Sequence, residues 1–272
     1  MTQSLNDSIA MPLTFHKKPA LVAYVTCGDP DLATTREIVL AAIEAGADVI
    51  ELGVPFSDPV ADGPVIQRAS ERALKHGTSL AQVLTLAAEI RQHAQSTGII
   101  VFSYLNPILR MGMEKFCKVA RVAGVDGALV TDLPVEEAGE YLRAMRERDL
   151  SPVFLAAPTS PDERLKRIAE ASRGFVYAVS RTGVTGQRQD LAADAQKLVK
   201  RLRRVTKLPI ALGFGISTAE QFAEVGSFAD AVVVGSAIVE TIERNRGREA
   251  AAVGEFVRKL SVLSPRLSGT SR

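Results

Sequence analysis

Two acidic residues, Glu51 and Asp62, stand eleven positions apart in the stretch ELGVPFSDPVADGP (51–64), which directly follows the mostly apolar run 47–50. Glu51 lies among apolar residues at the expected end of a strand, where desolvation disfavours its charged form. A carboxyl group with a raised pKa suits proton transfer near neutral pH. The prolines of the following loop stiffen it. The stretch therefore predicts a proton-transfer acid and a second, loop-borne carboxylate.

Position alone leaves several acids as candidates. Asp29 and Asp132 follow two other expected strands and so share the placement of Glu51. Asp58 and Asp62 precede proline and glycine, and either residue could serve only to close an Asx-turn. The case for Glu51 is stronger because a carboxylate among apolar neighbours costs free energy and closes no turn.

Glycine follows the last two expected strands, in LGFGIST (212–218) and VVVGSAIVE (232–240). Glycine lets backbone N–H groups approach a ligand closely, and a helix beginning near Ser236 would direct its positive end at an anion. Tight turning alone would explain one such glycine, but two adjacent turns favour phosphate binding at this end of a barrel. The candidate ligands are the backbone groups of Gly213, Gly215 and Gly235.

The stretch SRTGVTGQRQDL (180–191) is long for a connection and contains two glycines. It is typical of a loop that closes over a substrate, although a plain insertion would look similar.

No expected strand ends in lysine, which argues against Schiff-base chemistry. The sequence also has no G-x-S-x-G nucleophile turn and no Walker loop.

Strands must position these residues, and eight short apolar runs alternate with stretches of helical periodicity. Near-continuous apolar strands between helices are typical of a parallel sheet covered by helices, and eight such units favour a closed (β/α)8 barrel. A doubly wound sheet is the alternative, but CGDP (27–30) is not the glycine fingerprint expected after its first strand. The runs are 20–26, 48–52, 99–104, 126–131, 152–155, 174–179, 209–212 and 230–234.

The 272 residues fit a single domain, 1–272, since no linker divides the chain. We expect a short helix at Thr2–Asn6, further helices in the loops, a terminal helix at Glu249–Leu260 and a disordered tail from about residue 262.

The composition of the chain argues against several classes of function. The 33 basic and 31 acidic residues nearly cancel, which argues against nucleic-acid binding. No apolar run reaches 18 residues, the start does not resemble a signal peptide, and the three histidines lack metal-ligand spacing. With only Cys27 and Cys117, we expect reduced thiols, a cytoplasmic protein, no membrane partner and no metal.

Taken together, the motifs resemble one family, the alpha subunit of tryptophan synthase. They occur in that family's order over nearly the whole chain: YVTCGDP (24–30), ELGVPFSDPVADGPVIQ (51–67), SYLNPIL (103–109), DLP (132–134), SRTGVTG (180–186), GFGIS (213–217) and VVVGSAIV (232–239).

The resemblance implies a (β/α)8 barrel that cleaves indole-3-glycerol phosphate to indole and glyceraldehyde 3-phosphate. It also implies a partner, the tryptophan synthase beta subunit, in an α2β2 heterotetramer. Pyridoxal phosphate would be bound by that partner, with no cofactor in this chain. A free-standing lyase and another phosphate-binding barrel isomerase are the alternatives.

By motif position, the resemblance makes Glu51 the catalytic acid and base and Asp62 the carboxylate that meets the indole nitrogen. Thr185 would contact this carboxylate. The remaining positions are the phosphate ligands Gly186, Gly215, Gly235 and Ser236, and the indole-pocket residues Tyr24, Phe102, Leu129, Tyr177 and Phe214. Tyr24 and Phe102 depart from the family's usual residues, which affects the shape of the pocket.

Three loops on one face would form a surface for the partner subunit. They are Pro55–Asp58, Asn106–Pro107 and Asp132–Pro134.

Overall fold

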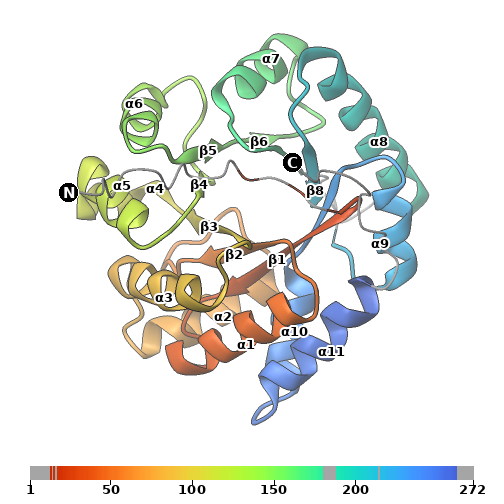
Figure 1. Cartoon of the computed structure of the whole chain (residues 1–272). Coiled ribbons are helices and arrows are strands. Elements are labelled where there is room, and N and C mark those ends of the chain that lie inside the picture. Colours follow the sequence, from red (N-terminus) through yellow and green to blue (C-terminus); the bar gives the residue numbers. More distant parts are fainter. Residues whose placement is uncertain (1–12, 14, 16, 180–187, 214, 262–272) are drawn as a thin grey trace, which may run out of the picture.

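The computed structural model describes residues 13, 15, 17–179, 188–213 and 215–261. Within these residues the chain forms nine strands and eleven helices, and the helices surround the strands (Figure 1). The strands are β1 (Ala20–Thr26), β2 (Val49–Gly53), β3 (Gly98–Ser103), β4 (Gly127–Val130), β5 (Ser151–Val153), β6 (Leu155–Ala156), β7 (Val176–Val179), β8 (Ile210–Gly213) and β9 (Ala231–Val234).

All neighbouring strands pair in parallel, in the order β5-β4-β3-β2-β1-β9-β8-β7-β6. The two outermost strands of this order, β5 and β6, are separated along the chain only by Phe154, so the sheet meets itself as a ring. The carbonyl of Phe154 accepts the N–H of Tyr177 at 3.1 Å, which bridges the interruption. The predicted (β/α)8 barrel is therefore confirmed, and its fifth strand is split into two segments.

The helices connect successive strands and cover the outer face of the ring. The long periodic stretches are helical as predicted, and short helices, such as those at Leu105–Met111 and Ala219–Gly226, occupy other parts of the connections. The helices are α1 (Leu32–Glu44), α2 (Pro64–Lys75), α3 (Leu80–His93), α4 (Leu105–Met111), α5 (Met113–Val122), α6 (Gly139–Glu147), α7 (Asp162–Ala171), α8 (Arg188–Val205), α9 (Ala219–Gly226), α10 (Ser236–Arg244) and α11 (Glu249–Ser261).

The terminal helix α11 lies against α1 and α10 on the outside of the barrel (Figure 1). The expected helix at 2–6 and the tail from residue 262 lie outside the described residues. Among the described helices, none is long and apolar enough to cross a membrane.

Strand residues alternate between two apolar clusters, because successive side chains of a strand point to opposite faces. Ala23 and Val25 face the helices, whereas Val22 and Val49 belong to the cluster that fills the barrel interior. Glu51 is two residues beyond Val49 and so points into the barrel. The prediction that Glu51 ends its strand was wrong, because β2 continues to Gly53.

Candidate functional site

A cavity of about 580 Å³ opens at the carboxyl ends of the strands. It brings together Glu51 from β2 and the two glycine turns that follow β8 and β9. Its lining consists of Tyr24, Glu51, Val60, Ala61, Ile66, Phe102, Leu155, Tyr177, Val179, Gly213, Gly215, Val233, Gly235 and Ser236.

Glu51 is completely buried at the base of this cavity. In the barrel sheet it pairs with Tyr24 on one side and Ile100 on the other. Neither carboxyl oxygen has a hydrogen-bond partner among the described residues. Because burial penalises the charged form, the pKa of Glu51 is raised to about 8. At neutral pH Glu51 is therefore a protonated acid, more deeply buried than its sequence neighbours alone predict.

Asp62 is not among the residues that line the cavity, but it directly follows the lining residue Ala61 in the chain. The hydroxyl of Tyr104 donates to Asp62 Oδ2 at 3.0 Å and accepts the N–H of Ala61 at 3.0 Å. Partial burial raises the pKa of Asp62, and the Tyr104 hydrogen bond opposes that rise. Asp62 is thus half-buried and held in place by the Tyr104 hydroxyl.

Tyr104 is a functional candidate that the sequence analysis did not single out. It is 2% exposed and stacks on Phe56 with ring centroids 4.9 Å apart. The signal in the sequence was its spacing, because Tyr104 stands two positions after Phe102 and two-residue spacing returns a side chain to the same face of a strand.

The end of the cavity suited to an anion is formed by glycine backbone and one helix start. Gly215 has a φ of +63°, a conformation that side chains disfavour. Gly235 precedes Ser236, the first residue of α10, so the N–H groups of this helix start are directed at the cavity wall. This geometry suits a phosphate group.

Aromatic side chains line the middle of the cavity. Tyr24 and Phe102 meet edge to face, with centroids 5.1 Å apart. The Tyr24 hydroxyl is turned toward Thr26, 3.4 Å away, and lies over Gly53, where any side chain would collide with it. Tyr24 therefore presents the body of its ring to the cavity, and its extra hydroxyl is accommodated by glycine.

One predicted pocket residue lies away from the cavity, and three predicted site residues are not described by the structure. Leu129 is fully buried in the barrel interior and is not among the residues that line the cavity. Thr185, Gly186 and Phe214 lie outside the described residues, as does most of the predicted closing loop.

The other candidate acids have different surroundings. Asp132 accepts the N–H of Leu105 at 2.7 Å, and Asp58 accepts the hydroxyl of Ser57 at 2.6 Å. Asp29 is ion-paired with two arginines. Glu51 is thus the candidate acid that lines the cavity, and Asp62 directly follows a residue that does. The described residues include no cluster of His, Cys, Asp and Glu that could hold a metal ion.

A parallel barrel with a large cavity at the carboxyl ends of its strands defines the class, a (β/α)8-barrel enzyme.

Comparison with known proteins identifies the family within this class. The family model described as tryptophan synthase alpha chain matches residues 12–264. The tryptophan synthase alpha chain of Solibacter usitatus is 54% identical over 84% of this chain and 85% of its own length. That of Methylococcus capsulatus is 48% identical over 90% and 92%. The chain belongs to the tryptophan synthase alpha chain family.

Solved structures agree with this assignment. A mutant tryptophan synthase alpha-subunit from Pyrococcus furiosus has a TM-score of 0.83 and 41% identity, covering 90% of this chain and 99% of that one. A Mycobacterium tuberculosis tryptophan synthase structure has a TM-score of 0.83 and 35% identity, covering 93% and 94%. The resemblance inferred from the motifs is therefore confirmed.

Proposed function

We propose that this chain cleaves indole-3-glycerol phosphate to indole and glyceraldehyde 3-phosphate, as the alpha subunit of a tryptophan synthase. The observation that carries the proposal is Glu51, a buried acid without a described partner, in the same cavity as two glycine turns suited to phosphate. Membership of the alpha chain family supports it.

The reaction needs a proton donor because indole leaves poorly as a carbanion. The Glu51 carboxyl protonates C3 of the indole ring, and the resulting positive charge spreads to the ring nitrogen. The carbon–carbon bond to the glycerol phosphate chain then breaks, and its electrons restore the neutral indole. The substrate hydroxyl on the adjacent carbon becomes the aldehyde and returns its proton to Glu51. One group thus serves as acid and then as base.

Asp62 supplies the negative charge for this intermediate. An ionised carboxylate directed at the indole N–H stabilises the developing cation, and this interaction strengthens only as the charge forms. Tyr104 holds Asp62 Oδ2 and leaves its other oxygen free of a described hydrogen bond, so that this oxygen can meet the ring nitrogen. Thr185 is proposed to add a further contact when loop 180–191 closes.

The phosphate group is assigned to Gly215, Gly235 and Ser236, together with Gly186. The aromatic groups of Tyr24, Phe102 and Tyr177 would surround the indole ring. Phe214 would complete the pocket. Charge-assisted hydrogen bonds from backbone N–H groups can anchor a phosphate without lysine.

A partner surface lies beside loop 54–63. A second cavity, of about 520 Å³, is formed there by Pro55, Phe56, Asn106, Pro107 and neighbouring residues. We assign this face to the beta subunit of an α2β2 assembly, which would bind the pyridoxal phosphate. Phe56 stacks on Tyr104, and Tyr104 donates a hydrogen bond to Asp62. Binding of the partner at Phe56 can therefore change the position of Asp62 through the Tyr104 side chain.

We further propose a single domain spanning 1–272 and a cytoplasmic location.

The direct test is to incubate the purified chain with indole-3-glycerol phosphate and to measure indole. We expect indole release, which increases when a beta subunit is titrated in. A phosphorylated aldose serves as the comparison substrate. Its isomerisation, without indole release from the first substrate, would contradict the proposal in favour of a barrel isomerase.

A further inference from the structure

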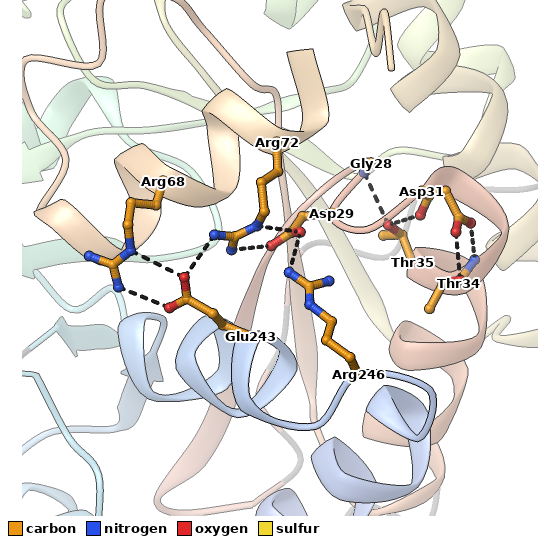
Figure 2. A network of polar contacts seen from close by, with 9 residues as sticks. All are labelled: Gly28, Asp29, Asp31, Thr34, Thr35, Arg68, Arg72, Glu243 and Arg246. Atoms are coloured by element: carbon orange, nitrogen blue, oxygen red, sulfur yellow. Dashed lines mark hydrogen bonds and ion pairs between the residues drawn. The ribbon is translucent and has the colours of Figure 1, made fainter. Parts of the chain in front are cut away.

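An ion-pair network joins three separate segments: the loop after β1, helix α2 and the end of helix α10 (Figure 2). Arg72 of α2 is its centre. It donates from Nε and Nη2 to the two oxygens of Asp29, at 2.9 and 2.7 Å, and from Nη1 to Glu243 Oε1 at 2.8 Å. Arg72 therefore connects all three segments with one planar group.

Two further arginines complete the network. Arg68, one turn before Arg72, donates to both oxygens of Glu243, at 3.1 and 2.9 Å. Arg246, in the turn after α10, donates to Asp29 at 3.1 Å. Figure 2 shows the two arginines of α2 facing Glu243 of α10 across the space between the helices.

The loop that carries Asp29 is itself fixed. The N–H of Gly28 is bonded to Thr35 Oγ1 at 3.0 Å, and Asp31 caps α1 through the N–H of Thr34 at 2.7 Å (Figure 2). Gly28 has a φ of +89°, and a side chain there would collide with Thr78. Asp29, at 1% exposure, is thus a rigid anchor for the arginines.

The other ends of the two helices lie in the proposed site. Helix α2 begins at Pro64, two residues after Asp62, and α10 begins at Ser236. Between the helices, Ala69 and Val239 pack with Tyr24. Apolar packing is not directional, so it allows sliding. The hydrogen bonds of a planar guanidinium that is bonded on two edges are directional, so they resist sliding of one helix along the other.

We infer that Arg72 and Glu243 are positioning residues, which hold α2 against α10 and thereby set the distance between Asp62 and the phosphate-binding start of α10. The inference rests on the proposed function, because the two ends of one substrate must reach these two points together. A misplacement of about 1 Å remote from the chemistry can cost up to roughly 10²-fold in rate. The ring and the tail would each still bind when the distance relaxes.

Glu243 keeps its negative charge throughout the working pH range. The hydrogen bond from Arg68, together with the charges of Arg68 and Arg72, lowers the pKa of Glu243 to about 2. Glu243 therefore stays ionised at every pH at which Glu51 titrates, and the effects of the two residues on rate are separable.

The test compares Glu243→Ala with Glu240→Ala, one turn earlier on the same helix. Glu240 forms its close ion pair with Arg244 of α10 and acts on Arg68 of α2 only through the longer-range attraction of its charge, so its loss leaves every hydrogen bond between Glu243 and α2 intact. We expect Glu243→Ala to lower kcat about tenfold at every pH, within the range for a small misplacement. Its affinity for glycerol 3-phosphate, which occupies only the tail site, stays within about twofold of the wild type. Glu240→Ala should match the wild type in kcat and in affinity for glycerol 3-phosphate. Arg72→Lys keeps the positive charge but loses the planar guanidinium, so its kcat should lie between those of Glu243→Ala and the wild type.

A purely structural role would lower the folded fraction and leave kcat per folded molecule unchanged. Equal kcat in the two variants, per folded molecule, would therefore overturn the inference. A parallel loss of glycerol 3-phosphate affinity in Glu243→Ala would also overturn it, because the network would then support the phosphate site itself.

Crystal structures of the two variants give a readout that does not depend on activity. We expect the Asp62 Cα to Ser236 Cα distance to change in Glu243→Ala and to stay constant in Glu240→Ala. An unchanged distance in both contradicts the inference. Failure of the wild type to release indole would instead count against the proposed function, and the distances would still decide the positioning role.

Discussion

Glu51 and Asp29 are both buried acids at the same end of the barrel, yet their surroundings are opposite. Asp29 is 1% exposed and accepts hydrogen bonds from Arg72 and Arg246. Glu51 is 0% exposed, and both its oxygens are without a partner among the described residues. The two carboxyl groups are equally buried, but only that of Asp29 is paired with positively charged side chains.

The comparison shows that burial alone does not identify a catalytic acid. A buried carboxylate that is paired with guanidinium groups is fixed in its charged form and contributes to structure. An unpaired one is held in its neutral form and has a proton to donate. The absence of a counter-charge, rather than the absence of water, therefore distinguishes the proposed catalytic acid from the structural one.

Removal of the proton at Glu51 has the largest expected effect. Glu51→Gln keeps the shape of the side chain but cannot transfer a proton, so we expect kcat to fall by about 10²- to 10⁴-fold. Steady-state indole release measures the loss, and calorimetry with glycerol 3-phosphate checks that the tail site is intact. Substantial residual cleavage would remove Glu51 from its role.

Removal of the Asp29 carboxylate should lower stability. In Asp29→Ala the guanidinium groups of Arg72 and Arg246 lose their buried partner, and because both guanidinium groups are partly exposed, loss of these charged hydrogen bonds costs about 1.5–3 kcal/mol of unfolding free energy. Urea denaturation measures it. The matched control is Glu255→Ala, which breaks the exposed Arg248–Glu255 pair and should cost about 0–1 kcal/mol. Equal costs would mean that the Asp29 pairs are as weak as surface pairs.

Neutralising Asp62 tests the second carboxylate. Asp62→Asn retains the Tyr104 contact but not the charge, so we expect turnover to fall by about 10²-fold, as for loss of one electrostatic stabiliser. Affinity for glycerol 3-phosphate should remain. A collapse of that affinity would make Asp62 a structural residue of the loop.

The pH dependence sharpens the contrast at Glu51. Because the acid form protonates the substrate, kcat/KM, which reports the free enzyme, should decline about tenfold per unit once the pH exceeds the Glu51 pKa of about 8. Steady-state rates of indole release measured from pH 6 to pH 10 show this decline. A rate that is flat to pH 10 would contradict a proton donor with this pKa.

The same pKa shift also affects stability. The folded pKa of Glu51 is raised above the unfolded value of 4.5, so the folded state holds the proton more tightly. Stability from this group is fully present below pH 4.5 and is lost as the pH rises through about 8. Glu51→Gln should therefore gain unfolding free energy relative to the wild type between these two values.

The smallest expected effect is that of Tyr104. In Tyr104→Phe, Asp62 loses one hydrogen bond, and a net loss of roughly 1 kcal/mol corresponds to a decrease of about fivefold in kcat. Because the Tyr104 bond lowers the pKa of Asp62, its removal should move the acid limb of the pH–rate profile to higher pH. An unchanged limb would mean that Tyr104 does not act through Asp62.

Much of the fold was predictable, because it depends on local patterns. Eight apolar runs separated by helical stretches are sufficient for a parallel barrel, and each predicted run overlaps a strand. Glu51 was predictable as a special acid because its apolar neighbours are adjacent in sequence. Gly215 and Gly235 were predictable as turn residues, since glycine directly after a strand supplies the backbone freedom that a tight turn needs.

The partners of these residues were not predictable. Tyr104 and Asp62 are 42 positions apart, and Arg72 and Glu243 are 171 apart. No local pattern specifies such pairs, because their contact depends on how the barrel closes and on the registers of β1, β2 and β9.

The sequence by itself determined the alternation of strand and helix, the acid in the second strand and the glycine turns, since these follow from propensity and periodicity along a few residues. Only the tertiary structure decided which buried acid keeps its proton. Asp29 meets two guanidinium groups where α2 and α10 converge, and Glu51 meets none among the described residues. Charge compensation acts through space, so it is decided by packing.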